Sequence, residues 1–144
     1  MTSPSIMIGR FLLGLYFVVP GLMKFTAFDD TLAYMQSHGI PMAEPLLYIA
    51  GVTNIVGGLL LMTGRHVKLV AFGFVIYVLL VNIMLHDFWT MSGDEAARET
   101  QNFIKNLGIL AGLLVLAGSA HARGLSARNW WRSDKFITRF TGFR

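Results

Sequence analysis

Four long apolar stretches occupy most of this 144-residue sequence, and each is about long enough to cross a lipid bilayer. A bilayer core about 30 Å thick requires roughly 20 helical residues. Because a backbone in lipid must satisfy its own hydrogen bonds, stretches of this length and composition can only be helices. With 54% hydrophobic and 14% charged residues, the chain is too apolar for a soluble domain of this size. We therefore expect membrane spans at residues 6–23, 46–62, 67–85 and 102–118.

The predicted fold class is all-α, an integral membrane four-helix bundle formed by residues 1–120. Glycine and alanine residues within the spans supply small faces that allow membrane helices to approach closely. Residues 121–144 form a separate basic tail. If residues 128–143 are helical, aromatic and basic side chains fall on opposite faces, which predicts an amphipathic helix on the inner leaflet. An anchor that fixes depth and topology is the simpler interpretation of this tail, and a docking site for a cytoplasmic partner is the alternative.

The charged residues are sorted by sign around the spans. Nine of the 12 Lys and Arg residues lie at the start of the first span, between the second and third, or after the fourth: Arg10, Arg65, Lys68, Arg123, Arg128, Arg132, Lys135, Arg139 and Arg144. Seven of the 8 Asp and Glu residues lie in the other two loops: Asp29, Asp30, Glu44, Asp87, Asp94, Glu95 and Glu99. Cytoplasmic segments collect Lys and Arg, so we expect a multi-pass membrane protein with both termini in the cytoplasm. This segregation explains the net charge of +4 without a nucleic-acid partner.

Several polar side chains lie where lipid makes them expensive, and they converge at the outer ends of the spans. Asn54 reaches the midplane, because it lies nine residues, or about 14 Å, into the second span. Asn82 and His86 are four residues apart and share a helix face, as do Asn102 and Asn106. The predicted outward-facing polar pocket consists of Lys24, Asn54, Asn82, His86, Asp87, Trp89, Lys105 and Asn106.

Two explanations of this cluster stay open on residue types alone. In the structural one, amides and an ion pair of Lys24 or Lys105 with Asp87 hold the bundle in register. In the functional one, the same groups bind the head of a small amphipathic ligand such as a quinone. A quinone needs donors to its carbonyl oxygens, an ionisable group that exchanges protons and an apolar slot for its tail. No metal site is predicted, because the Met and His residues on the outer side lack tight spacing and the chain has no cysteine.

The order and spacing of short motifs resemble the DoxX family of small four-helix membrane proteins over residues 6–118. The resemblance rests on Gly-Arg-Phe-Leu-Leu-Gly-Leu at residues 9–15, Gly-Leu-x-Lys-Phe at 21–25, Gly-Gly-Leu-Leu-Leu at 57–61, His-Asp-Phe-Trp at 86–89 and Asn-Phe-x-Lys-Asn-Leu at 102–107. The family implies a membrane subunit with redox associations. Its members include the small subunit of a thiosulfate:quinone oxidoreductase and proteins linked to quinone or catechol stress.

The family's recurring polar positions match Arg10, Lys24, His86, Trp89, Lys105 and Asn106. One position departs from the family: members often carry Glu in the second span, and this chain has Asn54. An amide forms hydrogen bonds but does not take up or release a proton at physiological pH, which makes a proton-coupled mechanism through this position doubtful.

The leading hypothesis is an inner-membrane subunit that binds a quinone or similar lipophilic redox molecule and acts with a redox partner. The alternatives are a non-enzymatic scaffold or assembly subunit and, with less support, a small-solute transporter. The sequence does not decide whether the chain is an enzyme; if it is, a quinone-linked oxidoreductase subunit without its own cofactor is expected, and no catalytic residue is assigned. The expected partners are the lipid bilayer and a redox protein, and a homo-oligomer stays open.

Overall fold

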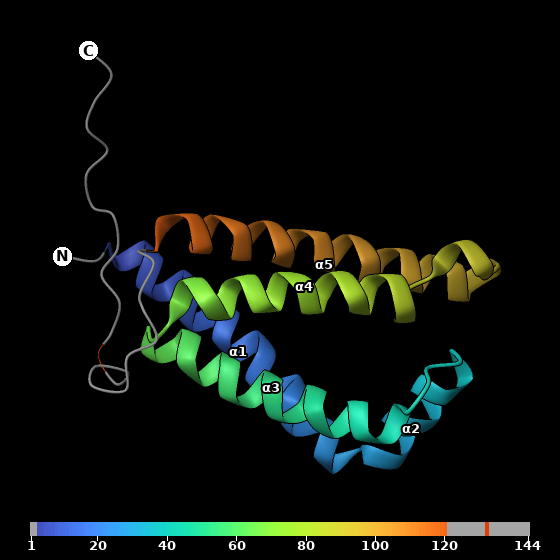
Figure 1. Cartoon of the computed structure of the whole chain (residues 1–144). Helices are drawn as coiled ribbons and strands as arrows, with labels where there is room; N and C mark the ends of the chain where they lie inside the picture. Colours follow the sequence, from blue (N-terminus) through green and yellow to red (C-terminus); the bar gives the residue numbers. More distant parts are fainter. Residues whose placement is uncertain (1–2, 121–131, 133–144) are drawn as a thin grey trace.

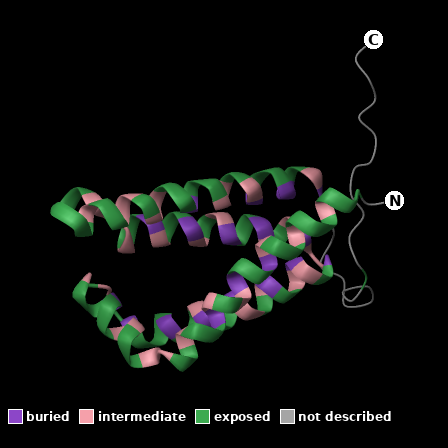
Figure 2. Ribbon diagram, turned by 180° about the vertical axis from the view of Figure 1, so that it is seen from behind, coloured by how far each residue is buried: buried purple, intermediate pink, exposed green. Residues whose placement is uncertain are grey.

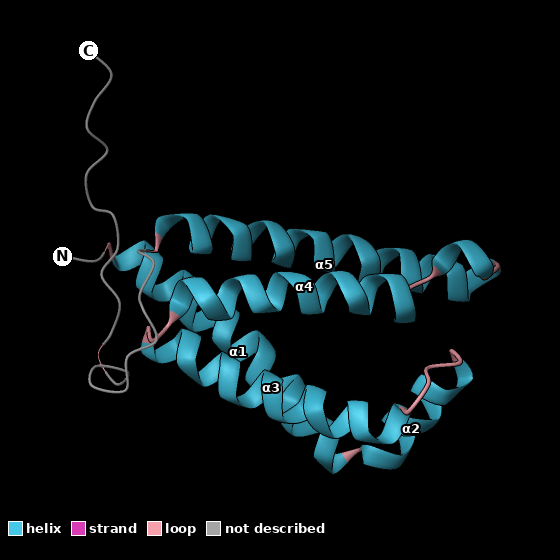
Figure 3. Ribbon diagram, viewed as in Figure 1, coloured by secondary structure: helices cyan, strands magenta, loops and turns pink. Residues whose placement is uncertain are grey.

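The structure, a computed structural model, describes residues 3–120 and residue 132. Apart from residue 132, the predicted amphipathic helix at 128–143 therefore lies outside the described residues. The described part of the chain contains helices and loops and no strand (Figure 3). Its elements are α1 (Pro4–Thr26), α2 (Phe28–Ser37), α3 (Ala43–Thr63), α4 (Val67–Leu85), the 3-10 helix η1 (Phe88–Thr90) and α5 (Gly93–Ser119). Four of these helices, α1, α3, α4 and α5, are long and apolar enough to cross a membrane. The predicted all-α membrane bundle is confirmed.

The spanning helices run alternately up and down, so their ends form two layers with different charge (Figure 1). One end holds the start of α1 and the turn between α3 and α4, with Arg10, Arg65 and Lys68; we call it the basic end. The opposite end holds α2, η1 and the start of α5 and carries the seven acidic residues grouped above; we call it the acidic end. The half of the bundle next to each end takes the same name.

The observed helices differ most from the predicted spans at the start of α5. This helix begins at Gly93, whereas the fourth span was expected from residue 102. The additional residues are polar and give no hydropathy signal, but Asp94 and Glu95 occupy the first turn, where acidic side chains favour a helix. As a consequence Glu99 lies on a helix and not in a loop. The helix α4 coincides with the third predicted span, and α1 and α3 are slightly longer than expected.

The end of α3 is built from Gly64 and Arg10. Gly64 has a left-handed φ of 71°, its N–H donates to Leu61 O (3.0 Å), and the N–H of Arg65 donates to Leu60 O (2.8 Å). This is the Schellman arrangement that closes many helices. The Arg10 guanidinium fills the space that a Cβ at Gly64 would need. A cation is favourable beside the carbonyl end of a helix. Stabilising the end of α3 therefore explains why α1 carries a charged residue at position 10.

The helices α1 and α3 pack closely because glycines face each other. A Cβ at Gly14 would lie 2.5 Å from Gly58 O, and one at Gly58 would lie 2.6 Å from Gly14 O. Two helical turns further toward the acidic end, a Cβ at Gly21 would lie 2.9 Å from the Asn54 Cβ, and one at Gly51 would lie 2.6 Å from the Phe25 ring. Small residues at such a crossing allow the van der Waals contact that drives association in lipid.

The bundle consists of two helix pairs, α1 with α3 and α4 with α5, and contacts within each pair outnumber those between the pairs. In the basic half the pairs share one apolar core, in which the Phe17 and Phe74 rings stack at 3.7 Å. Its other buried residues are Leu61, Val67, Ala71, Val78, Leu113, Leu116, Ala117 and Ala120. The pairs separate toward the acidic end (Figure 1). Buried residues line the facing sides of the helices, and large apolar residues are exposed outward, as expected for lipid-facing surfaces (Figure 2).

The short helix α2 reaches across this separation. Met35 of α2 joins Ala43 and Leu47 of α3 in a second small core, against which Leu85 at the end of α4 also packs. The Tyr34 hydroxyl donates to Leu85 O (2.9 Å). Burial, together with the nearby acidic groups, raises the pKa of Tyr34 to about 12, so this hydroxyl stays a donor at physiological pH. The segment from α2 to α3 therefore ties the two helix pairs together at the acidic end.

Candidate functional site

A chamber of 140 Å³ lies between the helix pairs in the acidic half. All four spanning helices, and His86 just after α4, contribute to its wall. The lining residues are Tyr16, Phe17, Pro20 and Lys24 of α1, Asn54 of α3, Tyr77, Val78 and Val81 of α4, His86, and Asn106 of α5. Its floor is the Phe17 side of the apolar core, so it closes toward the basic half.

A wider groove of 490 Å³ adjoins the chamber between α1 and α5. The two voids share Tyr16, His86 and Asn106, and the groove is further lined by Asn102, Lys105, Gly108 and Ile109. A Cβ at Gly108 would meet nothing within 4 Å, which shows how loosely this side is packed. Both α1 and α5 are apolar enough to cross a membrane, so the groove lies between two candidate membrane spans.

One set of polar groups is bonded internally and joins three helices. The Tyr16 hydroxyl donates to Asn106 Oδ1 (3.1 Å), Asn106 Nδ2 donates to Asn82 Oδ1 (2.8 Å), and Asn82 Nδ2 donates to Phe103 O (3.2 Å). Asn82 and Asn106 are 2% and 8% exposed. Their amide groups thus satisfy each other, and Asn82 lies behind the chamber and not on its wall. This chain of hydrogen bonds holds α1, α4 and α5 in register.

A second set of polar groups lines the voids, and its members lack some of the hydrogen bonds or ion pairs that they could form. Asn54 is 2% exposed. Its Nδ2 donates to the Tyr77 hydroxyl (3.3 Å), while its Oδ1 is buried without a partner. Lys24 is half-buried on the chamber wall, and Lys105 is exposed in the groove. Neither ammonium group has an ion-pair partner within the described residues. A buried polar atom left unpaired costs about 1 to 3 kcal/mol, which favours a bound polar group in this chamber.

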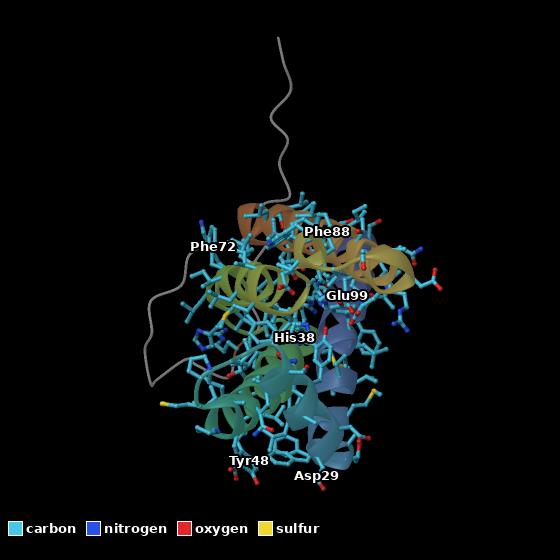
Figure 4. All side chains as sticks on the ribbon, turned by 90° about the vertical axis from the view of Figure 1, so that its right-hand side faces the viewer. Asp29, His38, Tyr48, Phe72, Phe88 and Glu99 are labelled. Atoms are coloured by element: carbon cyan, nitrogen blue, oxygen red, sulfur yellow. The ribbon has the colours of Figure 1, made fainter. Side chains whose placement is uncertain are left out.

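His86 and Glu99 form the tightest polar contact of the site. His86 Nδ1 lies 2.6 Å from Glu99 Oε2, and the side chains are only 16% and 14% exposed. Asn102 Nδ2 also donates to Glu99 Oε2 (3.1 Å). Because Nδ1 is engaged by the carboxylate, Nε2 is the ring nitrogen that stays available to the two voids lined by His86. Viewed from the acidic end, Glu99 and His38 lie near the centre of the molecule, between the helix pairs (Figure 4).

Two residues of the predicted pocket lie outside it. Asp87 Oδ1 is 3.8 Å from His38 Nε2, and Asp87 Oδ2 accepts from the Thr90 hydroxyl (2.9 Å). The expected ion pair of Asp87 with Lys24 or Lys105 is therefore wrong: the turn after α4 directs this carboxylate toward the loop after α2. Trp89 is 57% exposed and packs its ring against Phe88 and Phe103 at the bundle surface.

The structure brings in four polar residues that were not in the predicted pocket: Tyr16, Tyr77, Glu99 and Asn102. Tyr16, Pro20 and Lys24 are spaced four residues apart, so their shared helix face is visible in the sequence once a pocket is assumed. Glu99 is the residue that the late predicted start of the fourth span concealed. Among the described residues, no cluster of three or more His, Asp or Glu side chains is suited to a metal ion.

Comparison with known proteins places this arrangement in a family. The DoxX family's sequence pattern matches residues 5–87. The chain is also 33% identical over 112 residues to the inner membrane protein YphA of Escherichia coli (strain K12), an alignment that covers 78% of this chain and 80% of the relative. No solved structure matches the chain. With its four apolar helices, the chain is a multi-pass inner-membrane protein. The protein belongs to the DoxX family.

Proposed function

We propose that this protein binds the head group of a quinone, or of a similar lipophilic redox molecule, in the chamber between its helix pairs. The observation that carries the proposal is the convergence of polar groups from all four spanning helices on one void, with some of those groups unpartnered. Groups needed only to hold helices together would satisfy each other, as Asn82 and Asn106 do.

The size of the chamber supports a head group of one six-membered ring. An engineered protein cavity of about 150 Å³ takes up benzene, and this chamber has a volume of 140 Å³. It is too small for a bulky head such as a haem or a flavin. The adjoining 490 Å³ groove provides space for substituents and for the first part of a tail, and its opening between α1 and α5 lets the tail continue into the bilayer.

The chemistry of the wall suits a ring with two oxygen substituents. The Lys24 ammonium and the Tyr77 hydroxyl are donors for a carbonyl oxygen. Asn54 Oδ1, which is buried without a partner, is an acceptor for a hydroxyl of the reduced ring. If the amide is turned, the Tyr77 hydroxyl donates to Oδ1 and Nδ2 becomes the donor for a carbonyl oxygen. His86 supplies an imidazole nitrogen that can accept a proton from the ligand or return one to it. Phe17, Val78 and Val81 supply the apolar faces that a ring packs against.

The proposal includes a protein partner and an orientation. The chain has no cysteine and hence no thiol relay. We propose that electrons pass between the bound quinone and a separate redox protein, and that this chain supplies the membrane site without a cofactor of its own. With both termini in the cytoplasm, the acidic end and the chamber belong to the periplasmic side.

The test is a titration of the purified protein in nanodiscs with short-chain benzoquinones, followed by calorimetry or fluorescence quenching. We expect saturable binding that weakens about three- to tenfold in each of His86→Ala, Lys105→Ala and Asn54→Leu, since each removes about one hydrogen bond. Ile76→Ala is the matched control, because Ile76 is 61% exposed on the lipid side of α4. Absence of saturable binding, or equal affinity in all four variants, contradicts the proposal.

A non-enzymatic scaffold is the second candidate, and the bonded chain from Tyr16 through Asn106 to Asn82 favours it. In a scaffold these amides serve only to hold the helices in register. The two candidates differ in what a chamber variant loses: a scaffold loses stability or a partner, whereas a binding subunit loses ligand affinity and keeps its fold.

A further inference from the structure

We propose that the chamber binds its ligand as an oxyanion, and that His86 accepts the proton of an acidic hydroxyl on the ligand ring. This inference rests on the proposed function, because it concerns the same site and narrows the ligand to lipophilic phenols and ring-hydroxylated quinones. Two observations carry it: the contact of His86 with Glu99, and the charge balance of the two voids.

The His86–Glu99 contact orients the imidazole for proton uptake. With the carboxylate 2.6 Å from Nδ1, the neutral ring carries its proton on Nδ1 and presents a lone pair at Nε2. No hydrogen bond to Nε2 is present within the described residues, and His86 is the residue that lines both voids at their acidic edge. Glu99 is itself fixed by Asn102 Nδ2 (3.1 Å), so the carboxylate acts as a positioning residue that stabilises the imidazolium once it forms.

The charge balance around the voids favours an anion. Lys24 lines the chamber and Lys105 lines the groove, and both lack an ion-pair partner within the described part of the chain. Against these two positive charges stands one carboxylate, Glu99, which already binds His86 and Asn102. The carboxylate of Asp87 accepts a hydrogen bond from Thr90 and lies 3.8 Å from His38 Nε2, beyond hydrogen-bond distance, and it lines neither void. A ligand oxyanion between two ammonium groups completes the balance in surroundings of low dielectric constant.

The proposed step is a proton transfer that conserves atoms and electrons. The ring O–H bond of the ligand breaks, its proton forms an N–H bond at Nε2 of His86, and the electron pair of the O–H bond stays on the ligand oxygen. Nothing is oxidised or reduced. The neutral imidazole becomes an imidazolium beside Glu99, and the oxyanion is stabilised by the lysines. The titratable or charged groups around His86 on the packed elements are Lys24 and Tyr16 of α1, Tyr34 of α2, His38, Asp87, and Glu99 and Lys105 of α5.

The experiment uses a 4-alkyl-2-nitrophenol, whose phenolate form has a visible absorption band that its phenol form lacks. The probe is titrated with acid and base in nanodiscs that contain the full-length protein and in empty nanodiscs of the same lipid. We expect the apparent pKa of the bound probe to fall by about one unit or more, a tenfold or larger shift of its ionisation toward the phenolate. The methyl ether of the probe, which has no proton to give, should bind at least several-fold more weakly.

Glu99→Gln and Asp87→Asn form the matched pair of variants. Each removes one carboxylate next to the His86 turn, but only Glu99 contacts the imidazole. We expect the shift of the probe pKa to be lost in His86→Gln, reduced in Glu99→Gln and Lys24→Met, and unchanged in Asp87→Asn. Probe affinity is measured in the same titrations and identifies any variant that has lost the chamber.

The outcomes separate the two proposals. If the probe binds saturably but its pKa is the same as in empty nanodiscs, or if His86→Gln keeps the full shift, the oxyanion inference is overturned while ring binding stands. An equal loss of the shift in Asp87→Asn and Glu99→Gln also overturns it, because the effect is then one of general charge. If the probe and the benzoquinones both fail to bind, the proposed function fails as well.

Discussion

The basic and acidic halves of the bundle use the same four helices but solve different problems. In the basic half, glycines bring α1 against α3, and stacked Phe17 and Phe74 close the space between the pairs. In the acidic half the pairs separate, and the space holds a chamber lined by amide, hydroxyl, imidazole and ammonium groups. The basic half is thus closed by side chains, and the acidic half is open. The comparison teaches that the closed basic half sets the geometry of the open acidic half, which leaves polar groups free for a ligand.

The largest expected effect is in the core of the closed half. Phe74→Ala removes a ring that is 2% exposed, stacks on Phe17 and packs against Gly57. We expect a loss of about 3 to 5 kcal/mol in the free energy of unfolding, measured by denaturant titration in micelles. Phe72→Ala is the control, since Phe72 is 45% exposed on the same helix and lies at the periphery of the bundle (Figure 4). Equal effects of the two substitutions contradict a closed half.

The next largest effect on stability is expected at the glycine contact between α1 and α3. Gly14→Ala places a Cβ against Gly58 O and Met62, backbone and side chain of the facing helix. Overpacking of this kind costs about 1 to 3 kcal/mol, and we expect that decrease in the free energy of unfolding. Gly9→Ala lies on the same helix with open space around the new Cβ and should change stability by less than about 0.5 kcal/mol. If Gly14→Ala is as harmless as Gly9→Ala, the two helices are not in contact there.

Asn82 tests the bonded polar groups that hold α1, α4 and α5 in register. Asn82→Ala leaves Asn106 Nδ2 and the Phe103 carbonyl without their partner. We expect a loss of about 1 to 3 kcal/mol in the free energy of unfolding, measured by thermal unfolding, because Asn106 Nδ2 stays buried. Tyr16→Phe removes only one hydrogen bond at an exposed residue and should cost less, about 0.5 to 1.5 kcal/mol. If the Asn82→Ala protein is as stable as the wild type, contacts other than these hydrogen bonds hold α1, α4 and α5 in register.

The smallest effect on stability is expected in the chamber itself. Asn54→Leu removes a buried amide whose Oδ1 has no partner and whose Nδ2 makes one long hydrogen bond, to the Tyr77 hydroxyl (3.3 Å), and the new side chain has a similar size. We expect a change in the free energy of unfolding within about 1 kcal/mol of zero, and a gain is compatible with the account. Benzoquinone binding should nevertheless weaken. A strongly destabilised Asn54→Leu protein with unchanged affinity assigns Asn54 to the fold and removes it from the site.

The sequence predicted the spans because long apolar runs in lipid have one structural solution. It did not predict the start of α5, since the polar residues before Asn102 carry no hydropathy signal, and Glu99 was placed in a loop for that reason. Helical spacing predicted that Asn82, His86 and Asn106 lie near one another, and in the structure all three lie in the acidic half. It could not show that Asn82 turns to Asn106 while Asn54 faces the chamber, because the direction of an amide depends on the tertiary packing of its neighbours.

Tyr16 and Tyr77 show a second limit of the sequence. A tyrosine within an apolar span is as compatible with a lipid-facing or core position as with a pocket, and only the crossing of the helices places both hydroxyls at one void. Asp87 shows the converse. Its position beside His86 in the sequence suggested the pocket, but the turn after α4 separates the two side chains and gives each a different partner.

The most direct test of the open half uses the absence of cysteine from the chain. A single cysteine is introduced at Asn54→Cys or at Leu61→Cys, two turns apart on α3, and the rate of labelling by a small uncharged thiol reagent is measured in nanodiscs with and without benzoquinone. Leu61 is 0% exposed in the closed core, so its cysteine should react slowly under both conditions. The account predicts fast labelling at position 54 that the quinone suppresses. Equal slow rates at both positions, or no protection by any ring ligand, contradict an open chamber that receives a ligand.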